Sequence, residues 1–357
     1  MNINHLIDFN ELTPSDWEEL YELTLRIIDH PIDYVDKCKG KLLATLFYEP
    51  STRTMLSFQS AMLRLGGNVI GFDNPDNSSV SKGENLKDTI RTISNYSDIV
   101  VIRNPYEGSA YAASLYAGVP VINAGDGKHL HPTQTLADLV TIKKEKGALE
   151  GLTIGCCGDL MNGRTVHSLL KAMSLFKNNK FYLISTFPLK TPKYITDIIK
   201  KSGNEYIEVR TIEECISELD VIYMTRIQRE RFRSAQEYEK QSGIYVLDEK
   251  KLKKASKDII ILHPLPKVDE ISDEVDYDSR ALYFKQAQYG MYVRMALILK
   301  LIGKNIEQKL PNSDQKDIKC PNPNCITNIE KYLPTKLYSI DSERKGKACK
   351  YCDYRIN

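Results

Sequence analysis

The chain has 357 residues, of which 42% are hydrophobic and 27% are charged, a composition typical of globular proteins. Its 49 basic and 47 acidic residues leave a net charge of +2, which does not favour a nucleic acid or a membrane surface as partner. No apolar run is long enough for a membrane span, and the N-terminal residues lack the apolar core of a signal peptide. We therefore expect a cytoplasmic protein with two domains and a small third one.

Predicted helices and strands alternate along most of the chain. Residues 1 to about 40 are predicted to be helical, with a helix start at Thr13-Pro14-Ser15-Asp16. The runs predicted as strands are residues 42–48, 68–72, 98–102, 119–123, 152–157, 181–185, 206–210, 221–224 and 259–262. This alternation predicts an α/β protein with doubly wound parallel sheets. Ligands of such sheets bind beyond the carboxyl ends of the strands, so polar segments at these places are candidate sites.

The segment Glu49-Pro50-Ser51-Thr52-Arg53-Thr54 follows the first predicted strand and opens a helix that carries apolar residues on one face. Backbone N–H groups at a helix start favour an anion, small hydroxyl groups add donors, and an Arg fork matches phosphate oxygens. The segment predicts a phosphate site. The alternative is an ordinary Ser or Thr helix cap beside a solvated Arg.

Three further polar segments follow predicted strands in the first half of the chain. Residues 76–84 form a long polar loop, whose simplest interpretation is a mobile surface loop. Arg103 stands at a strand end, and residues 125–134 lead through His131-Pro132-Thr133-Gln134 into a helix. A single His before Pro is more commonly an ordinary loop residue, so this segment needs further support.

The second half of the chain repeats the strand–helix alternation. A Gly-rich turn at residues 158–163 follows a strand, but the G-x-G-x-x-G fingerprint of dinucleotide sites is absent. Residues 220–231 end in several cations, and His263-Pro264-Leu265-Pro266 is either a functional loop or a plain proline-rich turn. Residues 289–299 are predicted to form a helix.

The C-terminal segment contains four cysteines with the spacing of metal ligands. A polar linker leads to two cysteine pairs with the spacings C-x4-C and C-x2-C, formed by Cys320, Cys325, Cys349 and Cys352. Two thiolate pairs on one short segment predict a structural zinc site with four Cys ligands, rather than disulfides or unrelated free cysteines. A zinc ribbon beside Lys345, Lys347 and Lys350 also leaves a nucleic-acid-binding module as an alternative.

Several of these motifs resemble those of one enzyme family. Residues 47–54, 131–134 and 163–168 resemble the aspartate and ornithine carbamoyltransferases. Residues 220–231 and 263–266 resemble the aspartate type, and the Ser-Met-Gly element of the ornithine type is absent. The cysteine segment resembles the zinc domain of the aspartate-type regulatory chain, although the nucleotide-binding domain that precedes it in the family has no counterpart here. Met55 departs from the pattern, because relatives often carry Arg there.

The resemblance implies the organisation of the chain. Residues 1–135 with 288–305 would form a carbamoyl-phosphate-binding domain, and residues 136–287 an aspartate-binding domain. Residues 306–318 would form a linker, and residues 319–357 a zinc domain like that of the regulatory chain. It also implies carbamoyl transfer from carbamoyl phosphate to L-aspartate in pyrimidine synthesis, without a redox cofactor.

The resemblance also implies a role for each site residue. Carbamoyl phosphate would be held by Ser51, Thr52, Arg53, Thr54, Arg103, His131, Gln134, Pro264, Leu265 and, from an adjacent subunit, Ser78 and Lys82. Of these, Arg53, Thr54, Arg103, His131 and Gln134 would act in catalysis. Aspartate would be held by Lys82, Arg164, Arg226 and Gln228, because a doubly charged substrate needs several cations.

The implied assembly is a homotrimer or a higher assembly, since family members complete their sites across subunits. We expect weak or no regulation by nucleotides. Three alternatives stay open: transfer to another amine such as ornithine, a non-catalytic homologue that binds phosphate, and a zinc-ribbon protein that binds nucleic acid. The sequence does not decide whether the zinc domain docks on its own subunit or on another one.

Overall fold

A computed structural model describes residues 1, 3–227, 234, 236, 239, 244–307, 319–339 and 346–356. Contacts between Cα atoms divide the chain into two compact units. Unit 1 comprises Met1–Thr133 and Met291–Asn357, and unit 2 comprises Gln134–Gly290. The chain passes from unit 1 to unit 2 within helix α5 (Pro132–Lys146) and returns within helix α10 (Tyr283–Leu301).

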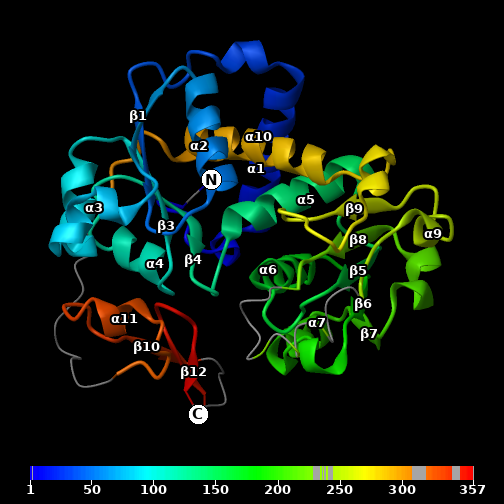
Figure 1. Cartoon of the computed structure of the whole chain (residues 1–357). Helices are drawn as coiled ribbons and strands as arrows, with labels where there is room; N and C mark the ends of the chain where they lie inside the picture. The colour runs from blue at the N-terminus through cyan, green and yellow to red at the C-terminus, as the bar shows by residue number, and fades with distance from the viewer. Residues whose placement is uncertain are drawn as a thin grey trace. The chain divides into compact units, whose positions relative to one another are not determined.

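Unit 1 is built on a four-stranded parallel sheet in the order β2-β1-β3-β4 (Figure 1). The strands are β1 (Leu42–Phe47), β2 (Asn68–Phe72), β3 (Ile99–Asn104) and β4 (Val121–Asp126). Its helices are α1 (Pro14–Asp29), α2 (Thr52–Arg64), α3 (Leu86–Ser94) and α4 (Ser109–Ser114), joined by the C-terminal part of α10. One face of the sheet packs on α3 and α4, where apolar residues of β1 and β3 meet those of both helices.

Local sequence explains where these helices start. α1 begins after Thr13, whose side chain accepts a hydrogen bond from the backbone N–H of Asp16, while Asp16 reaches back to Thr13. This reciprocal capping box is a strong N-terminal signal. α3 begins after Asn85, whose side chain accepts a hydrogen bond from the N–H of Asp88. Each helix start is therefore encoded within a few residues.

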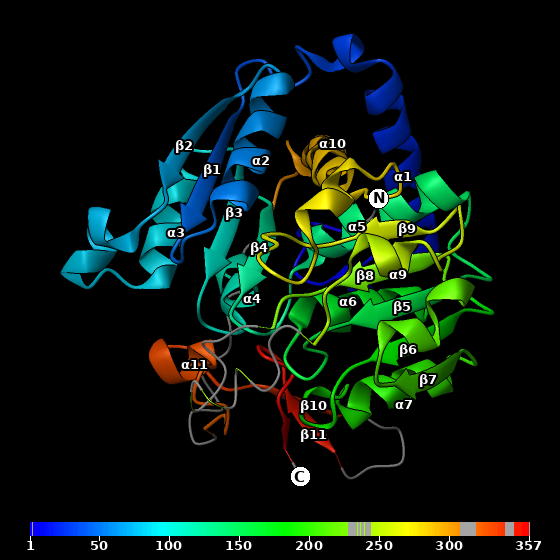
Figure 2. The ribbon, with the colours of Figure 1, turned by 45° about the vertical axis from the view of Figure 1, so that its right-hand side comes forward.

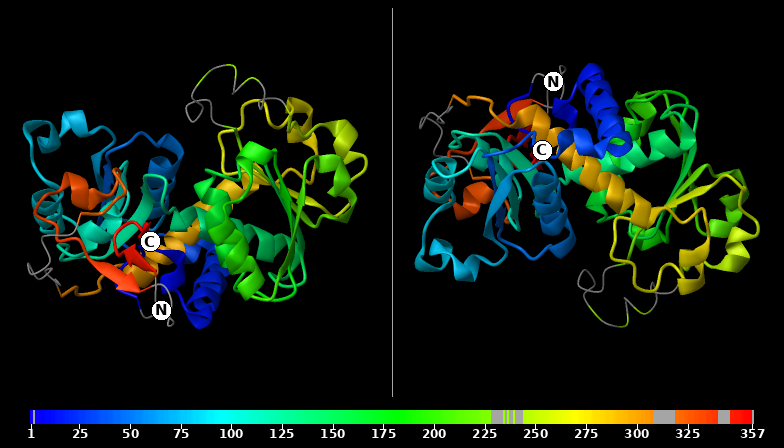
Figure 3. Two further views of the ribbon diagram at one scale, coloured as in Figure 1. Left: turned by 90° about the horizontal axis from the view of Figure 1, so that it is seen from below. Right: turned by 90° about the horizontal axis from the view of Figure 1, so that it is seen from above.

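The C-terminal segment belongs to unit 1 and forms a small cysteine module, defined here as residues 319–339 and 346–356. It contains α11 (Ile326–Ile329) and an antiparallel sheet of β10 (Leu337–Ser339), β11 (Lys347–Cys349) and β12 (Arg355–Ile356). Its four cysteines and Tyr351 share one apolar cluster with α3 and α4. In both views of Figure 3, this orange-to-red segment lies beside the cyan part of unit 1.

Unit 2 has a five-stranded parallel sheet in the order β7-β6-β5-β8-β9 (Figure 2). The strands are β5 (Thr153–Cys157), β6 (Lys180–Ile184), β7 (Glu205–Val209), β8 (Val221–Met224) and β9 (Ile260–Leu262). Its helices are α6 (Arg164–Met173), α7 (Lys193–Lys201) and α9 (Glu249–Leu252), with most of α5 and the first part of α10. Among the described residues, no helix combines the length and apolar character that crossing a membrane requires.

The predicted α/β class with two parallel sheets and a cysteine cluster is confirmed. The helical prediction for residues 1 to 40 was too broad, because the α-helix there covers only Pro14–Asp29. His30 and Pro31 end it, since the residue before a proline is disfavoured in helical geometry. The predicted helix at residues 289–299 is part of the longer α10.

Candidate functional site

The predicted phosphate segment lies between the end of β1 and the start of α2. Ser51 occupies the cap position of α2, but its side chain makes no capping hydrogen bond. The N–H groups of the first turn therefore stay available for an external acceptor, as an anion site requires. Arg53 lies in this turn with an exposed side chain, and it forms no ion pair with any residue that the structure describes. These features favour the phosphate interpretation over an ordinary cap.

Arg103 lies on the neighbouring strand, where it is in register with Phe47 of β1. Its guanidinium pairs with the carboxylate of Glu49 at 2.7 Å and donates to the carbonyl of Ala124 at 3.2 Å. The Arg103 side chain is only 11% exposed, so the carboxylate balances a largely buried charge. Glu49 is thus the carboxylate paired with Arg103 in this structure.

The turn after β4 brings His131 close to the backbone of Gly125, which Arg103 also borders. Gly125 has a φ of +124°, and a Cβ at this position would lie 3.0 Å from Nη1 of Arg103 and 3.6 Å from Cδ2 of His131. Both side chains therefore border the backbone of Gly125, and a larger residue would displace them. Arg103 and the buried His131, the two residues predicted as oxyanion donors, thus both border Gly125.

These residues lie where ligands of parallel sheets bind. In unit 1 the chain runs from β1 to β2 on one side and returns to β3 and β4 on the other. The order therefore reverses between β1 and β3, which is the switch point where such sheets hold ligands. Arg53 follows β1 and Arg103 ends β3, so two of the predicted phosphate ligands flank this position.

Ser78 and Lys82 lie on the loop between β2 and α3, within or beside the 3-10 helix Ser79–Lys82. Ser78 caps this short helix by accepting from the N–H of Val80, and it donates to the carbonyl of Pro75 at 2.7 Å. Lys82 is exposed and forms no ion pair within the part of the chain that the structure describes. Its ammonium group is available to a neighbouring molecule.

In unit 2, two predicted aspartate-binding residues follow adjacent strands. Arg164 is the first residue of α6, after β5, and Arg226 follows β8. β5 and β8 are paired, and the strand order of unit 2 reverses between them. Both arginines thus stand at the switch point of this second sheet, half-buried. The third predicted residue, Gln228, lies outside the described residues.

Gln134 is oriented by a buried carboxylate. Its amide Nε2 donates to Oδ1 of Asp138 at 2.7 Å, one helical turn along α5. Asp138 also accepts from Nε2 of Gln286 at 2.6 Å and from the hydroxyl of Tyr223 at 3.0 Å. Because the Gln134 amide nitrogen is engaged, its carbonyl oxygen is left as the acceptor for a ligand.

Pro264 and Leu265 lie on a loop fixed by a buried pair. Nε2 of His263 lies 2.6 Å from Oε1 of Glu270, and Nδ1 of His263 accepts from the backbone N–H of Leu265 at 2.7 Å. His263 and Glu270 are 2% and 5% exposed. Burial alone would raise the pKa of Glu270, but the hydrogen bonds that it accepts from His263 and from the backbone N–H of Val268 outweigh burial and lower it. This pair orients the carbonyl groups of the loop.

The four predicted metal ligands come together in the cysteine module. Cys320, Cys325, Cys349 and Cys352 are all buried, and their Sγ atoms lie within 4.8 Å of one another. Two of the Sγ–Sγ distances are 3.6 and 3.8 Å, too long for disulfides. A tetrahedral site with metal–sulfur bonds of about 2.3 Å requires sulfur separations of about 3.8 Å. The donor set therefore fits a tetrahedral metal ion.

Sequence reasoning missed residues that position the predicted ones. Asp138 lies four residues after Gln134 on the same helix, a spacing at which side chains meet, so the sequence did contain a signal for it. Asp126 accepts from the N–H groups of Gly108 and Leu130, and its other contacts are with Asn123 and His129. Three of these contacts lie within four residues of Asp126 and the fourth, with Gly108, lies 18 residues away, but no sequence motif pointed to Asp126.

Three family models match the chain. Residues 4–144 match "Aspartate/ornithine carbamoyltransferase, carbamoyl-P binding domain", and residues 150–301 match "Aspartate/ornithine carbamoyltransferase, Asp/Orn binding domain". Residues 315–357 match "Aspartate carbamoyltransferase regulatory chain, metal binding domain".

Individual sequences and solved structures similar to this chain are also aspartate carbamoyltransferases. The aspartate carbamoyltransferase catalytic subunit of Clostridium perfringens (strain SM101 / Type A) is 59% identical over 301 residues, 84% of this chain and 98% of that relative. The structure of the M. jannaschii aspartate transcarbamoylase catalytic subunit in an orthorhombic crystal form has a TM-score of 0.79 at 46% identity, covering 84% and 98% of the two chains. The Trypanosoma cruzi aspartate transcarbamoylase in complex with carbamoyl phosphate and aspartate gives 0.77 at 35% identity, covering 84% and 96%.

Proposed function

The chain belongs to the aspartate carbamoyltransferase family and carries the metal-binding domain of a regulatory chain in the same polypeptide, and on this premise we propose how it works. It transfers the carbamoyl group of carbamoyl phosphate to the amine of L-aspartate, giving N-carbamoyl-L-aspartate and phosphate. The observation that carries the mechanism is the pair of arginines, Arg53 and Arg103, at the switch point of the unit 1 sheet.

Binding of carbamoyl phosphate uses the open start of α2. The N–H groups and hydroxyls of Ser51, Thr52 and Thr54, with the forks of Arg53 and Arg103, hold the phosphate oxygens. Glu49 supports this role, because a carboxylate already occupies Arg103 and a phosphate would replace it in kind. Thr54, Arg103 and His131 stabilise the oxyanion that forms when the amine attacks the carbonyl carbon.

The carbamoyl NH2 group needs acceptors, since it only donates. Gln134 supplies its carbonyl oxygen, because Asp138 engages its amide nitrogen. The backbone carbonyls of Pro264 and Leu265 supply two more, on the loop that His263 and Glu270 hold. Oriented in this way, the carbonyl carbon faces the incoming amine.

Aspartate carries two carboxylates, which Arg164, Arg226 and Gln228 bind with Lys82 of an adjacent subunit. The amine nitrogen bonds to the carbonyl carbon, the bond between this carbon and the phosphate oxygen breaks, and the amine proton leaves with the released phosphate. Carbamoyl aspartate is a precursor of the pyrimidine ring, so the reaction serves pyrimidine synthesis. No covalent intermediate or redox cofactor is needed.

We propose a homotrimer in which Ser78 and Lys82 complete the site of a neighbour. Two observations support an interface on unit 1. Lys82 is exposed without an ion pair among the described residues, and the apolar side chains of Leu56, Leu63 and Ile70 are 53%, 55% and 36% exposed. Large apolar side chains left in water on one unit are typical of an association surface.

For the cysteine module we propose one structural Zn2+ per chain. Four thiolates leave no open coordination position, which is the arrangement of structural zinc sites. All eight cysteines are free and buried, which favours the reducing cytoplasm as the location of the protein.

The test is carbamoyl transfer by the purified full-length chain, with aspartate and ornithine offered in parallel. We expect carbamoyl aspartate to form and no citrulline. A preference for ornithine, or no transfer to aspartate, would overturn the proposal. Binding of duplex or single-stranded nucleic acid that weakens steeply with salt would support the alternative for the cysteine module.

A further inference from the structure

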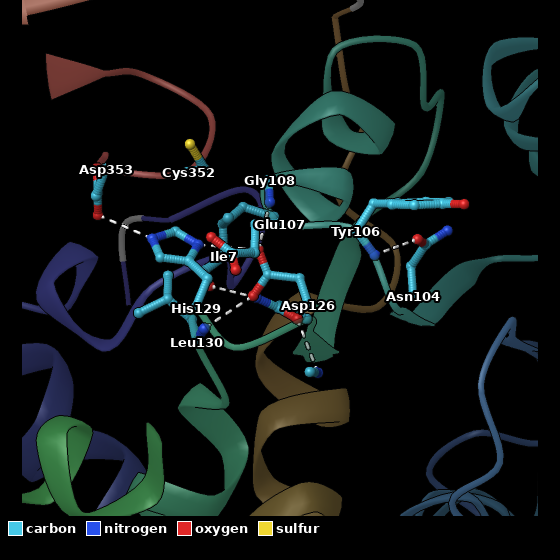
Figure 4. A network of polar contacts seen from close by, with 12 residues as sticks. Ile7, Asn104, Tyr106, Glu107, Gly108, Asp126, His129, Leu130, Cys352 and Asp353 are labelled. Atoms are coloured by element: carbon cyan, nitrogen blue, oxygen red, sulfur yellow. Dashed lines mark hydrogen bonds and ion pairs between the residues drawn. The ribbon is translucent and has the colours of Figure 1, made fainter. Parts of the chain in front are cut away.

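A chain of charged side chains connects the cysteine module to the turn that carries His131. The ring of His129 lies between two carboxylates: Nδ1 is 3.0 Å from Oδ2 of Asp126, and Nε2 is 3.0 Å from Oδ2 of Asp353. Figure 4 shows this arrangement, with Asp353 next to Cys352 on the module and Asp126 at the end of β4. Carboxylate oxygens only accept, so both ring nitrogens of His129 act as donors.

Asp126 is the centre of this network. It is fully buried, and its two oxygens accept from the N–H groups of Gly108 and Leu130 at 2.8 and 3.0 Å. The amide of Asn123 donates to it as well, at 3.1 Å. Asp126 therefore fixes the turn of residues 126–130, which is closed by a hydrogen bond from its own N–H to the carbonyl of Leu130.

This turn is flanked by two proposed phosphate-site elements. The preceding residue, Gly125, borders Arg103 and His131, and His131 directly follows Leu130. A rotation of the Asp126 carboxylate would release Leu130 and move the backbone on which His131 stands. Because a displacement of about 1 Å can cost a large factor in reactivity, the orientation of Asp126 matters to the site.

The module holds Asp353 in a conformation that serves this contact. Asp353 has a φ of +55°, in the left-handed region that few non-glycine residues adopt. Its other oxygen, Oδ1, accepts from the hydroxyl of Tyr338 at 3.0 Å, which fixes the carboxylate. An uncommon backbone conformation held by the surrounding structure points to a functional constraint.

We propose that His129 and Asp353 are positioning residues, through which the docked cysteine module orients Asp126 and thereby the Arg103–His131 part of the carbamoyl-phosphate site in its own chain. A metal ion held by Cys320, Cys325, Cys349 and Cys352 would support this role indirectly, by stabilising the fold of the segment that presents Asp353. This inference rests on the proposed function, which it extends by giving the C-terminal module a role in the phosphate site.

Another contact of the module provides a matched control. The hydroxyl of Tyr332 accepts from the N–H of Lys87 at 2.9 Å, and Oε1 of Glu330 accepts from the N–H of Leu86 at 2.9 Å. These bonds join the module to the start of α3 and include neither Asp126 nor His129. Tyr332→Phe therefore removes a docking contact without touching the network.

The experiment measures inorganic phosphate binding by isothermal titration calorimetry on full-length protein with its metal content verified. Asp353→Asn keeps the shape but removes the charge, and His129→Asn breaks the network from outside the module. We expect each to weaken phosphate binding about fivefold to tenfold, with the double variant no weaker than either single one. Tyr332→Phe should bind phosphate like the unmodified protein.

Steady-state kinetics supply the second readout. Both variants should raise the KM for carbamoyl phosphate about as much as they weaken phosphate binding, and leave the KM for aspartate within about twofold. Unchanged phosphate affinity in His129→Asn would overturn the inference, as would an equal loss in Tyr332→Phe, which would mean that docking alone matters. If the unmodified protein binds phosphate but transfers no carbamoyl group, the proposed function fails while the positioning role is still decided by the binding data.

Discussion

At the scale of single residues, Asp138 joins three parts of unit 2. It accepts hydrogen bonds from Gln134, Gln286 and Tyr223, and it is fully buried. Asp138→Asn replaces one accepting oxygen with an NH2 group, which can only donate. Because Gln134, Gln286 and Tyr223 all donate to this side chain, at least one hydrogen bond is lost. We expect the free energy of unfolding in urea to fall by about 3 kcal/mol, and kcat with carbamoyl phosphate to fall because Gln134 is no longer held.

A suitable control for Asp138 lies on the same helix. Glu145 accepts from the hydroxyl of Tyr289 and pairs with Lys285, and its side chain is 20% exposed. Glu145→Gln should cost less than about 1 kcal/mol, since partly exposed ion pairs contribute little. An Asp138→Asn protein as stable and active as Glu145→Gln would contradict the role assigned to Asp138.

The buried carboxylate of Glu270 predicts how the stability of the protein depends on pH. Its pKa lies below the ordinary value of 4.5, because the hydrogen bonds from His263 and from the N–H of Val268 favour the ionised form more strongly than burial opposes it. The ionised carboxylate therefore stabilises the protein fully above about pH 4.5, and this contribution is lost as the pH falls through the lowered folded-state pKa. Urea unfolding of Glu270→Gln should show a deficit at pH 7 that shrinks below pH 4.5. A deficit independent of pH would show that the charge of Glu270 has no part in it.

At the scale of secondary structure, α1 and α2 both begin after a residue with a hydroxyl side chain, but the two hydroxyl residues have different functions. Thr13 caps α1 through a capping box, whereas the side chain of Ser51 makes no capping bond to α2. We expect Thr13→Ala to lower the free energy of unfolding by about 1 kcal/mol without affecting phosphate binding. Ser51→Ala should cost less than about 0.5 kcal/mol but weaken phosphate binding. Urea unfolding and phosphate calorimetry on both variants test this, and a destabilised Ser51→Ala with normal phosphate affinity would restore the ordinary-cap interpretation.

At the scale of the whole molecule, metal removal should undo the docking of the C-terminal module. A segment of this size buries little apolar surface of its own, so the bound ion supplies much of its stability. After chelation we expect rapid proteolysis within residues 319–357, weaker phosphate binding and recovery of both on adding Zn2+. The measurements are elemental analysis, limited proteolysis and calorimetry. Unchanged proteolysis of verified metal-free protein would contradict this.

The proposed trimer predicts complementation between inactive variants. Arg53→Ala removes a ligand from the chain's own phosphate site, and Lys82→Ala removes one that reaches a neighbour. Each variant alone should be nearly inactive, but a mixture should regain part of the activity, because some sites combine two intact halves. Activity is measured after subunit exchange has been verified by mass. No recovery in exchanged mixtures would argue against a shared site.

The sequence alone determined features that depend on local patterns. β2 and β8 have the predicted bounds, because runs of apolar residues report burial directly. The start of α1 at Pro14 follows from its capping residues, and the spacing of the four cysteines predicted the cluster that the structure confirms. The resemblance of short motifs supplied the family, which the comparisons confirm.

Only the tertiary structure decided which of these segments meet. The strand orders put the segments of Arg53 and Arg103 on neighbouring strands of unit 1, and those of Arg164 and Arg226 on neighbouring strands of unit 2, and no local pattern encodes a strand order. The contact of His129 with Asp353 joins residues more than two hundred positions apart in the chain. His129 lies in the polar segment 125–134 and Asp353 follows Cys352, but neither local pattern indicates that the two side chains meet. Their meeting depends on how the cysteine module packs on α3 and α4, and such packing is set by complementary surfaces rather than by periodicity.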